Sequence, residues 1–301
     1  MSGVTRGFKR IIALICIVLL VLIFMGFRNC LLFEARTREI NTKEKFDLVI
    51  NQIKIWNPEK TAVVICDMWE NYPCLRAKEE INKLAPKVNE FADLMRKKGC
   101  VIIHAPDGDV SLYARDKARQ NLECLMERDF MKETFYENFI SHIFQFVSFS
   151  AEKFLTNKSK EYFDVFFQKN SCSEGCGCNP PCQSPLNFDF GREHSAIKID
   201  DNDFVVMDKF EEIYQLVRKK NIENILICGV HLNVCIVSRY YGVLNLLKLG
   251  CDVVIVRDLV DSLGRNAEIV KTQELFNSLV IRYAEDYGLK TTEFGFAKTK
   301  Y

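Results

Sequence analysis

The fold is decided by residues 225–256, which read ILICGVHLNVCIVSRYYGVLNLLKLGCDVVIV. An apolar run at 225–228 is followed by a loop, by apolar residues at helical spacing over 236–249, and by a second apolar run at 252–256. Short apolar runs of this kind are typical of strands buried on both faces of a parallel sheet. Gly250 is a suitable residue to close the helix. The stretch therefore predicts a strand, a helix and a strand joined by a right-handed crossover.

The same order of elements occurs elsewhere in the chain. Residues 61–66 predict a strand, residues 80–98 a helix that ends at Gly99, and residues 101–104 another strand. The other predicted elements are a strand at 204–207, a helix at 211–220, a helix at 274–287 and a short edge strand at 291–294. Strands that alternate with helices imply a parallel sheet with helices on both faces. The predicted fold class is therefore α/β, a three-layer α/β/α arrangement with a mainly parallel sheet.

A long insert, roughly residues 111–200, separates the two halves of this pattern. Its first part is rich in Phe and Tyr, and we expect a helix around residues 130–154. Its second part is a cysteine-rich loop at 172–182, which contains Cys172, Cys176, Cys178 and Cys182. Two disulfides or a loop of free thiols are the simplest interpretations, and a small metal site is the alternative.

The composition favours a globular domain without an affinity for nucleic acid. Of 301 residues, 48% are hydrophobic and 27% are charged, a balance that supports one large core. With Lys+Arg 41 and Asp+Glu 40, the formal net charge is +1, so no basic excess indicates nucleic-acid binding. Function must therefore be argued from a site for a small molecule.

The N-terminal region predicts a membrane anchor. Residues 11–27 (IIALICIVLLVLIFMGF) carry no charge, follow three basic residues and have the minimum length for a bilayer-spanning helix. They lack the small-residue site of a cleaved signal peptide, which is the alternative. We expect residues 1–28 to be the anchor, residues 29–57 a polar tether and residues 58–301 the α/β domain. The positive-inside rule then predicts a single-pass membrane protein whose C-terminal domain is lumenal or extracellular.

Candidate site residues follow the predicted strands. In an open parallel sheet, ligands bind beyond the carboxyl ends of the strands. Asp67 and Trp69 follow the strand at 61–66, and His104 and Asp107 lie at the end of the next strand. The loop Gly229-Val230-His231-Leu232-Asn233-Val234-Cys235 follows the strand at 225–228.

Cys235 lies where this loop enters the predicted helix. Free backbone N–H groups and the helix dipole would stabilise its thiolate and the oxyanion formed when the thiolate attacks a carbonyl. Asp67 could accept the thiol proton and later pass it to a leaving amine. Taken singly, a buried Cys is more often inert packing and an Asp after a strand is often a helix cap.

The stretches VVICDMW at 63–69 and ILICGVHLNVCI at 225–236 resemble the first-strand Asp and the G-V-x-T-N-x-C nucleophile loop of the isochorismatase-like cysteine hydrolase superfamily. That superfamily includes nicotinamidases and N-carbamoylsarcosine amidohydrolases. The resemblance covers about residues 58–110 and 200–262 and implies a Rossmann-like domain, often a homo-oligomer, that cleaves C–N bonds through Asp, Lys and Cys.

The resemblance also implies roles for individual residues. Asp67 would be the base, Cys235 the nucleophile, and the backbone N–H groups of His231 and Cys235 the oxyanion hole, with a cis peptide bond before His231. The residues expected in the substrate pocket are Trp69, Tyr72, His104 and Asn233. Trp69 and the Phe-rich insert favour an apolar or planar substrate.

The chain departs from the family pattern at its catalytic lysine. Asp208 stands at that position, at the end of the strand predicted at 204–207, and Lys209 follows it. Because successive strand residues face opposite ways, Lys209 can substitute only if the strand has ended or bulges. A second carboxylate near Asp67 would oppose thiolate formation unless Lys209, Arg239 or a metal offsets it. Asp208 and Lys209 are therefore both candidate catalytic residues.

We expect no cofactor, and a zinc ion is the alternative to consider. Some nicotinamidase-like proteins hold zinc with Asp and His side chains, and His104, Asp107 and His194 are the candidates in this chain. Their spacing differs from that of the family, and each histidine is more often structural than a ligand.

Three functional hypotheses remain open. The first is a hydrolase that cleaves an amide-type C–N bond of a small molecule through a thioester on Cys235. The second is a catalytically inactive, membrane-anchored domain that binds a small ligand or a protein partner. The third makes the cysteine-rich loop a redox or metal module.

Overall fold

The protein contains an eight-stranded sheet with the strand order β2-β1-β8-β7-β6-β3-β4-β5. The structure is a computed structural model, and it describes residues 30–41, 46–127, 188–263 and 272–298. The strands are β1 (Leu31–Asn41), β2 (Phe46–Trp56), β3 (Thr61–Cys66), β4 (Val101–Ala105), β5 (Phe204–Val205), β6 (Asn224–Val230), β7 (Asp252–Asp261) and β8 (Lys290–Thr292). All neighbouring pairs from β8 to β5 are parallel, and β1 is antiparallel to both of its neighbours.

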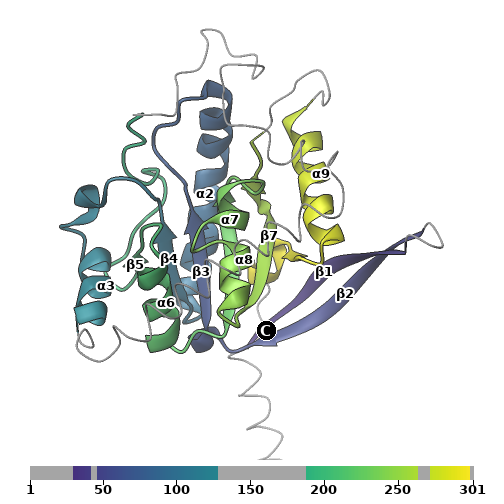
Figure 1. Ribbon diagram of the computed structural model, residues 1–301, viewed down its shortest axis with the longest axis horizontal. Coiled ribbons are helices and arrows are strands. Elements are labelled where there is room, and N and C mark those ends of the chain that lie inside the picture. Colours follow the sequence, from purple (N-terminus) through teal and green to yellow (C-terminus); the bar gives the residue numbers. More distant parts are fainter. Residues whose placement is uncertain (1–29, 42–45, 128–187, 264–271, 299–301) are drawn as a thin grey trace, which may run out of the picture.

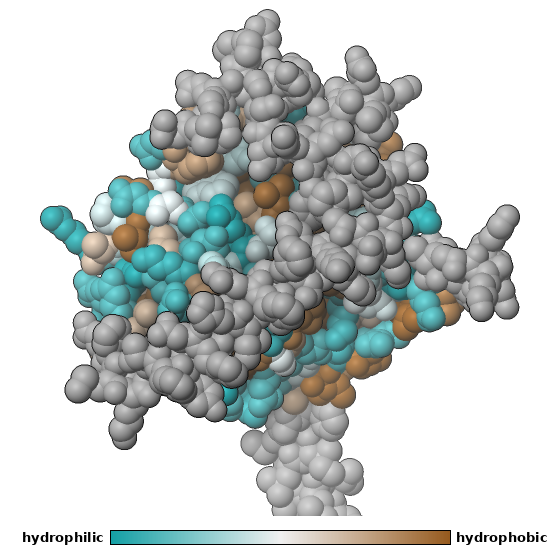
Figure 2. Space-filling model, in the orientation of Figure 1, coloured by the Kyte–Doolittle hydropathy of each residue, from teal (hydrophilic) through white to brown (hydrophobic). Residues whose placement is uncertain are grey.

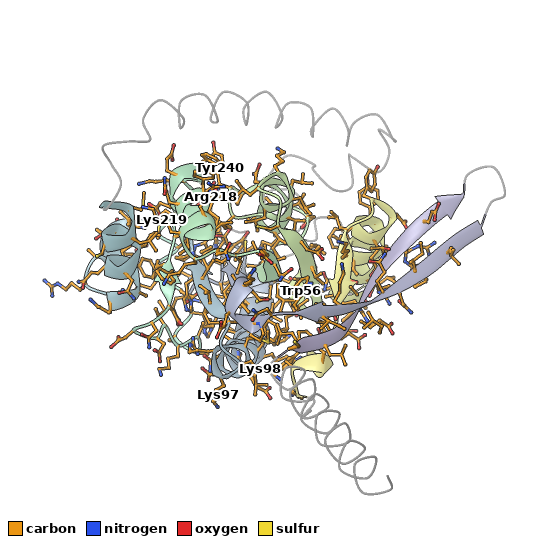
Figure 3. All side chains as sticks on the ribbon, turned by 90° about the horizontal axis from the view of Figure 1, so that it is seen from below. Trp56, Lys97, Lys98, Arg218, Lys219 and Tyr240 are labelled. Atoms are coloured by element: carbon orange, nitrogen blue, oxygen red, sulfur yellow. The ribbon has the colours of Figure 1, made fainter. Side chains whose placement is uncertain are left out.

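Helices cover both faces of this sheet (Figure 1). The α-helices are α2 (Leu75–Lys97), α3 (Lys117–Glu127), α6 (Phe210–Lys219), α7 (Cys235–Ser238), α8 (Val243–Lys248) and α9 (Gln273–Asp286). Short 3-10 helices are η1 (Pro58–Lys60), η2 (Val110–Tyr113) and η3 (Phe294–Lys298). In Figure 3, Lys97 and Lys98 at the end of α2 lie on one side of the sheet, opposite Arg218 and Lys219 at the end of α6.

Alternating side chains of the strands fill two apolar cores. Val63 and Ile65 of β3 pack with α2 and η3 on one face, whereas Ala62 and Val64 pack with the remaining helices on the other. Buried residues on both faces account for the unbroken apolar runs in the sequence. The predicted α/β fold class, three layers with a mainly parallel sheet, is confirmed.

Within the range 29–57, predicted as a polar tether, residues 31–41 and 46–56 form the antiparallel pair β1 and β2, called the hairpin below. Alternate residues of β1 are buried in the core, namely Leu31, Phe33 and Ala35. The opposite face of β1 presents Arg36 and Arg38 to the buried carboxylate of Glu285 in α9. Two of the charges that made this stretch look like a tether therefore face a single buried anion.

The hairpin extends beyond the body of the domain at the edge of the sheet (Figure 1). Several apolar side chains of β2 are exposed: Leu48, Val49, Ile53 and Ile55. Figure 2 shows hydrophobic surface, in brown, at its lower right, on the side where the hairpin lies in Figure 1. The strand predicted at 291–294 is present as β8, but it is not an edge strand. It lies inside the sheet, between β1 and β7.

The predicted membrane location is corrected. The run at 11–27, on which it depends, lies outside the described residues. Within the described ranges, no helix is both long and apolar enough to cross a bilayer. The longest of them, α2, has 23 residues, LRAKEEINKLAPKVNEFADLMRK, and carries charged side chains along its whole length. The helix expected around 130–154 and the cysteine-rich loop at 172–182 also lie outside the described residues.

Candidate functional site

Four polar residues follow four neighbouring strands of the parallel sheet. Asp67 follows β3, Asp107 follows β4, Asp208 follows β5 and Cys235 follows β6. The strands are adjacent in the order β6-β3-β4-β5, so their carboxyl ends form one edge. This edge is the expected position of a ligand site in an open parallel sheet.

Asp67 leaves β3 in a left-handed conformation, with a φ of 49°. Aspartate tolerates this region better than most residues do. Its backbone N–H donates to the carbonyl oxygen of Ala105 at 2.9 Å, and its carboxylate Oδ1 accepts a hydrogen bond from the hydroxyl of Tyr241 at 2.7 Å. Burial raises the pKa of Asp67 to about 8, although Arg239 and hydrogen bonds from Cys235 and Tyr241 oppose the rise.

Cys235 is the first residue of α7 and is only 6% exposed. Burial, followed by the negative charge of Asp67, raises the pKa of its thiol well above the usual value, and Arg239 opposes this rise. The sequence predicted a lowered pKa from the helix dipole. The structure differs because α7 has only four residues and the thiol has lost most of its contact with water.

Gly229 allows β6 to pass against β3 at the base of the site. Its φ is +108°, and a Cβ atom there would lie 2.1 Å from the carbonyl oxygen of Cys66. The residue after next is His231, and the peptide bond between Val230 and His231 is cis, as the family resemblance implied. The nucleophile loop thus begins immediately beside the strand that carries Asp67.

The helix predicted over 236–249 is interrupted, and the interruption supplies a site residue that the sequence analysis missed. Between α7 and α8, Gly242 packs so closely on α7 that a Cβ would meet three backbone oxygens within 2.9 Å. The Asn245 side chain donates to the carbonyl oxygens of Ser238 and Arg239, which end α7. The chain bend places Tyr241 against Asp67. A Gly within a helical pattern was the available signal.

Arg239 is the cation of this edge of the sheet. Its guanidinium bonds the Asp208 carboxylate at 2.7 Å and pairs with the Asp107 carboxylate at 2.8 Å. Lys209, the alternative predicted from sequence, lies apart. Its side chain is 58% exposed and pairs with Glu212 at 3.8 Å. From the sequence, Arg239 was expected only as one of the charges that offset Asp208, although its spacing of four residues from Cys235 is typical of a shared helix face.

An aromatic cluster lies beside the nucleophile loop. The Trp69 ring packs against Tyr72 and Phe190 with ring centroids 5.9 and 4.6 Å apart, and Tyr72 meets the His231 ring edge-on at 5.2 Å. The His231 ring is buried, neither of its nitrogens has a partner among the described residues, and burial lowers its pKa to about 3. The Asn233 amide is hydrogen-bonded to the backbone of Leu263: it donates to the carbonyl oxygen and accepts from the N–H.

His104 belongs to a buried ion cluster rather than to this edge. Its ring nitrogens contact the carboxylates of Glu193 at 2.6 Å and Asp203 at 3.1 Å. Arg96 of α2 binds the same Asp203 carboxylate through two nitrogens. Burial opposes protonation of His104, but the charge of Glu193 and hydrogen bonds to both carboxylates outweigh it and raise the pKa to about 9.

The residues considered for zinc do not converge. His104 is enclosed by its two carboxylates, Asp107 pairs with Arg239, and His194 bonds Asn82 and the backbone of Ala196. In the part of the chain that the structure describes, no three His, Cys, Asp or Glu side chains are grouped to hold a metal ion. These donors do not fit a zinc site, and no chemical step is assigned to one.

No protein-family model matches the chain, and no curated protein matches it. Several solved structures, however, are similar to it. A cysteine hydrolase from Pseudomonas syringae pv. phaseolicola 1448A is 10% identical, with 81% of this chain and 95% of that chain covered and a TM-score of 0.46. An isochorismatase family protein from Burkholderia thailandensis is 14% identical, with 81% and 97% covered and a TM-score of 0.43. A zinc complex of a pyrazinamidase from Pyrococcus horikoshii is 15% identical, with 78% and 99% covered and a TM-score of 0.41. Isochorismatase-like proteins, which the two sequence motifs resemble, are thus also among the solved structures similar to this chain.

Proposed function

We propose that this protein is a cysteine hydrolase that cleaves an amide-type C–N bond of a small molecule through a thioester on Cys235. The observation that carries the proposal is the placement of Asp67 and Cys235 on adjacent strand ends, both buried and interacting with each other and with Arg239. A thiol nucleophile, a carboxyl that can act as its base and a cation that can stabilise negative charge, together in one water-poor site, can support acyl transfer to sulfur.

Asp67 would act as the base. A carboxyl group with a pKa of about 8 is a much stronger base than an ordinary aspartate, and so it is suited to accept a thiol proton near neutral pH. The Cys235 sulfur would then attack the substrate carbonyl carbon, and the carbonyl π electrons would move to oxygen. When the C–N bond breaks, the proton on Asp67 passes to the leaving nitrogen, which departs as an amine or ammonia.

Water would complete the cycle. Asp67 takes a proton from water, the resulting hydroxide attacks the thioester carbon, and the C–S bond breaks to release a carboxylic acid and return the thiol. The backbone N–H groups of His231 and Cys235 are the proposed donors to the oxyanion in both steps. Trp69, Tyr72 and Phe190 provide an aromatic wall against which an apolar or planar part of the substrate can pack.

A binding domain without turnover is the second candidate. It is favoured by one observation, namely that burial raises the pKa values of both Asp67 and Cys235, so that both groups are largely uncharged near neutral pH. Such a site could hold a ligand through the Asp67 carboxyl and the His231 ring without forming a thiolate.

Alkylation of Cys235 by iodoacetamide as a function of pH distinguishes the two functions. Cys251 is a matched reference because it is 5% exposed, against 6% for Cys235, and burial raises its pKa to about 11. A base at Asp67 predicts that Cys235 reacts much faster than Cys251 and that its rate rises through about pH 8, where Asp67 loses its proton. Peptide mass spectrometry separates the two sites.

Asp67→Asn is the decisive variant. It should abolish the rise near pH 8 at Cys235 and leave the reaction of Cys251 unchanged. If Cys235 reacts as slowly as Cys251 and does not respond to Asp67→Asn, the hydrolase proposal is wrong and the binding domain is favoured. A positive result justifies a screen of small amides for ammonia or amine release, with Cys235→Ala as the blank.

A further inference from the structure

Arg239 reaches the proposed site because α7 is short. It follows the last residue of α7, and its backbone N–H still donates to the Cys235 carbonyl oxygen at 3.1 Å, while its own backbone is extended, with a ψ of 163°. One helical turn therefore separates the thiol from the guanidinium along the chain. The extended conformation turns the chain away from the helix axis at this residue.

Two carboxylates on neighbouring loops hold the guanidinium. Asp208, after β5, accepts from Arg239 through Oδ2 at 2.7 Å and from the backbone N–H of Tyr240 through Oδ1 at 2.8 Å. Asp107, after β4, pairs with the other terminal nitrogen at 2.8 Å. A planar guanidinium can satisfy both partners and retain further N–H donors, whereas a lysine ammonium cannot match that geometry.

The same cation acts on both reacting groups of the site. Arg239 opposes the rise of the pKa at Asp67 and at Cys235, and at Cys235 it does so through both charge and hydrogen bonding. The other titratable neighbours of the thiol do not favour its ionisation. Asp67, which follows β3, raises the pKa of Cys235, and a charge on Cys235 in turn raises the pKa values of Cys66 and Tyr241. Lys209 faces Glu212 at the start of α6 and is mostly exposed.

We infer that Arg239 supplies the positive charge that stabilises the Cys235 thiolate, and that Asp107 and Asp208 are the positioning residues that hold it there. The inference rests on the proposed function and deepens it. It assigns the cation of the site to the end of α7, and it explains why a carboxylate can stand at the end of β5. Asp208 does not replace a lysine in the chemistry; it binds the arginine that takes over the charge.

The test uses the full chain and three substitutions, with alkylation of Cys235 by iodoacetamide measured from about pH 6 to pH 10. Arg239→Gln removes the charge, Arg239→Lys keeps it, and Lys209→Gln removes the cation predicted from sequence. Loss of an opposite charge beside an acid shifts its pKa by about one to three units. We therefore expect Arg239→Gln to slow alkylation at about pH 7 by about tenfold or more, and to move the rise in rate to higher pH.

Arg239→Lys should recover most of this rate, because the charge remains although one carboxylate contact is lost. Lys209→Gln should leave the Cys235 profile as in the unaltered protein. A profile that shifts in Lys209→Gln but not in Arg239→Gln overturns the inference, as does an equal loss in Arg239→Gln and Arg239→Lys. Cys251 serves as the internal reference: if its alkylation accelerates in Arg239→Gln, the fold has loosened, and the comparison rests on Arg239→Lys.

The two proposals fail in different ways. If Asp67→Asn alters the Cys235 profile but both Arg239 variants leave it unchanged, the hydrolase proposal stands and Arg239 is not its cation. If neither Asp67 nor Arg239 influences Cys235, both proposals are wrong.

Discussion

Gly229 is the residue on which the closeness of Asp67 and Cys235 depends. It lies opposite Cys66 in the parallel pairing of β6 and β3, with a positive φ that only glycine adopts without cost. Because no side chain separates the strands there, the nucleophile loop starts in contact with the strand that carries the proposed base. The local backbone therefore sets the distance between the two reacting groups.

Replacing Gly229 by Ala should destabilise the protein far more than the same change at Gly250. Both glycines have positive φ, but a Cβ at Gly229 would lie 2.1 Å from the Cys66 carbonyl oxygen, whereas a Cβ at Gly250 meets nothing within 4 Å. We expect about 1 kcal/mol of destabilisation from backbone strain at Gly250. At Gly229 the overlap with the Cys66 carbonyl oxygen adds about 1 to 3 kcal/mol or more, the typical cost of overpacking a core. Equal effects in denaturant unfolding would show that close packing of the strands is unimportant.

The hydroxyl of Tyr241 should lower the pKa of Asp67. It donates to the carboxylate at 2.7 Å, and hydrogen bonding to the charged form favours that form. In Tyr241→Phe the pKa of Asp67 should therefore rise above about 8, so that the alkylation profile of Cys235 moves to higher pH. The ring and its packing remain, so unfolding should change by only about 1 kcal/mol. An unchanged profile would mean that Tyr241 packs against Asp67 without influencing its proton.

At this scale the sequence predicted the residues that follow strands and missed those that depend on a bend. Asp67 and Cys235 end or follow apolar runs, so their places along the sheet edge can be deduced from chain order alone. Tyr241 and Arg239 sit in a stretch of helical periodicity in which Gly242 indicates a break. Their inward position depends on backbone contacts of Gly242 and Asn245, which the local pattern does not specify.

Among the elements, the β1–β2 hairpin differs most from its prediction. It was predicted as a polar tether because its charges obscured the alternation of Leu31, Phe33 and Ala35. Two of these charges are accommodated by long-range pairing. Glu285 of α9, which is fully buried, accepts hydrogen bonds from Arg36 and Arg38 at 2.8 and 2.9 Å, and also one from Thr291 at 2.6 Å. Local sequence patterns depend on neighbours along the chain, so they do not predict a partner more than two hundred residues away.

Glu285→Ala should weaken the attachment of the hairpin to the body of the domain. The change leaves two arginines without their shared anion, and breaking a buried pair in this way costs roughly 3 to 5 kcal/mol. Glu293→Ala is the control because Glu293 is 64% exposed and pairs with Arg257 on the surface, a contact worth less than about 1 kcal/mol. Denaturant unfolding measures the difference, and limited proteolysis should cut within residues 31–56 of the Glu285 variant first. Similar stability of the two variants would contradict a buried link.

Across the whole molecule, the ion cluster around His104 joins parts of the chain that are distant in sequence. His104 belongs to β4, Glu193 and Asp203 to the segment that leads into β5, and Arg96 to α2. The sequence analysis placed His104 in the pocket because it lies near a strand end. Its neighbours Ile103 and Ala105 pack with the core opposite α2, so His104 points to the α2 face, away from the nucleophile loop.

The stability of the whole domain should fall as the pH rises from about 6.5 to about 7.5. The pKa of His104 rises from 6.5 to about 9 on folding, so the folded state binds a proton that the unfolded chain releases in this window. This linkage removes roughly 1 kcal/mol across the window. Asp67, whose pKa rises from 3.8 to about 8, has the same sign and removes a similar amount, roughly 1 kcal/mol. An upper limit of about pH 7.5 keeps most thiols of the unfolded chain protonated.

Urea unfolding of the unaltered protein and of Asp67→Asn separates these two contributions. The unaltered protein should lose roughly 2 kcal/mol between the two pH values, and Asp67→Asn only roughly half of that, since the Asp67 contribution is then absent and the His104 contribution remains. Because Glu193 and Asp203 retain their positions in Asp67→Asn, the residual slope reports on a protonated His104 held between two carboxylates. A stability that is flat or rises with pH in Asp67→Asn would mean that His104 is neutral when folded, and that the cluster does not hold the segment before β5 by charge.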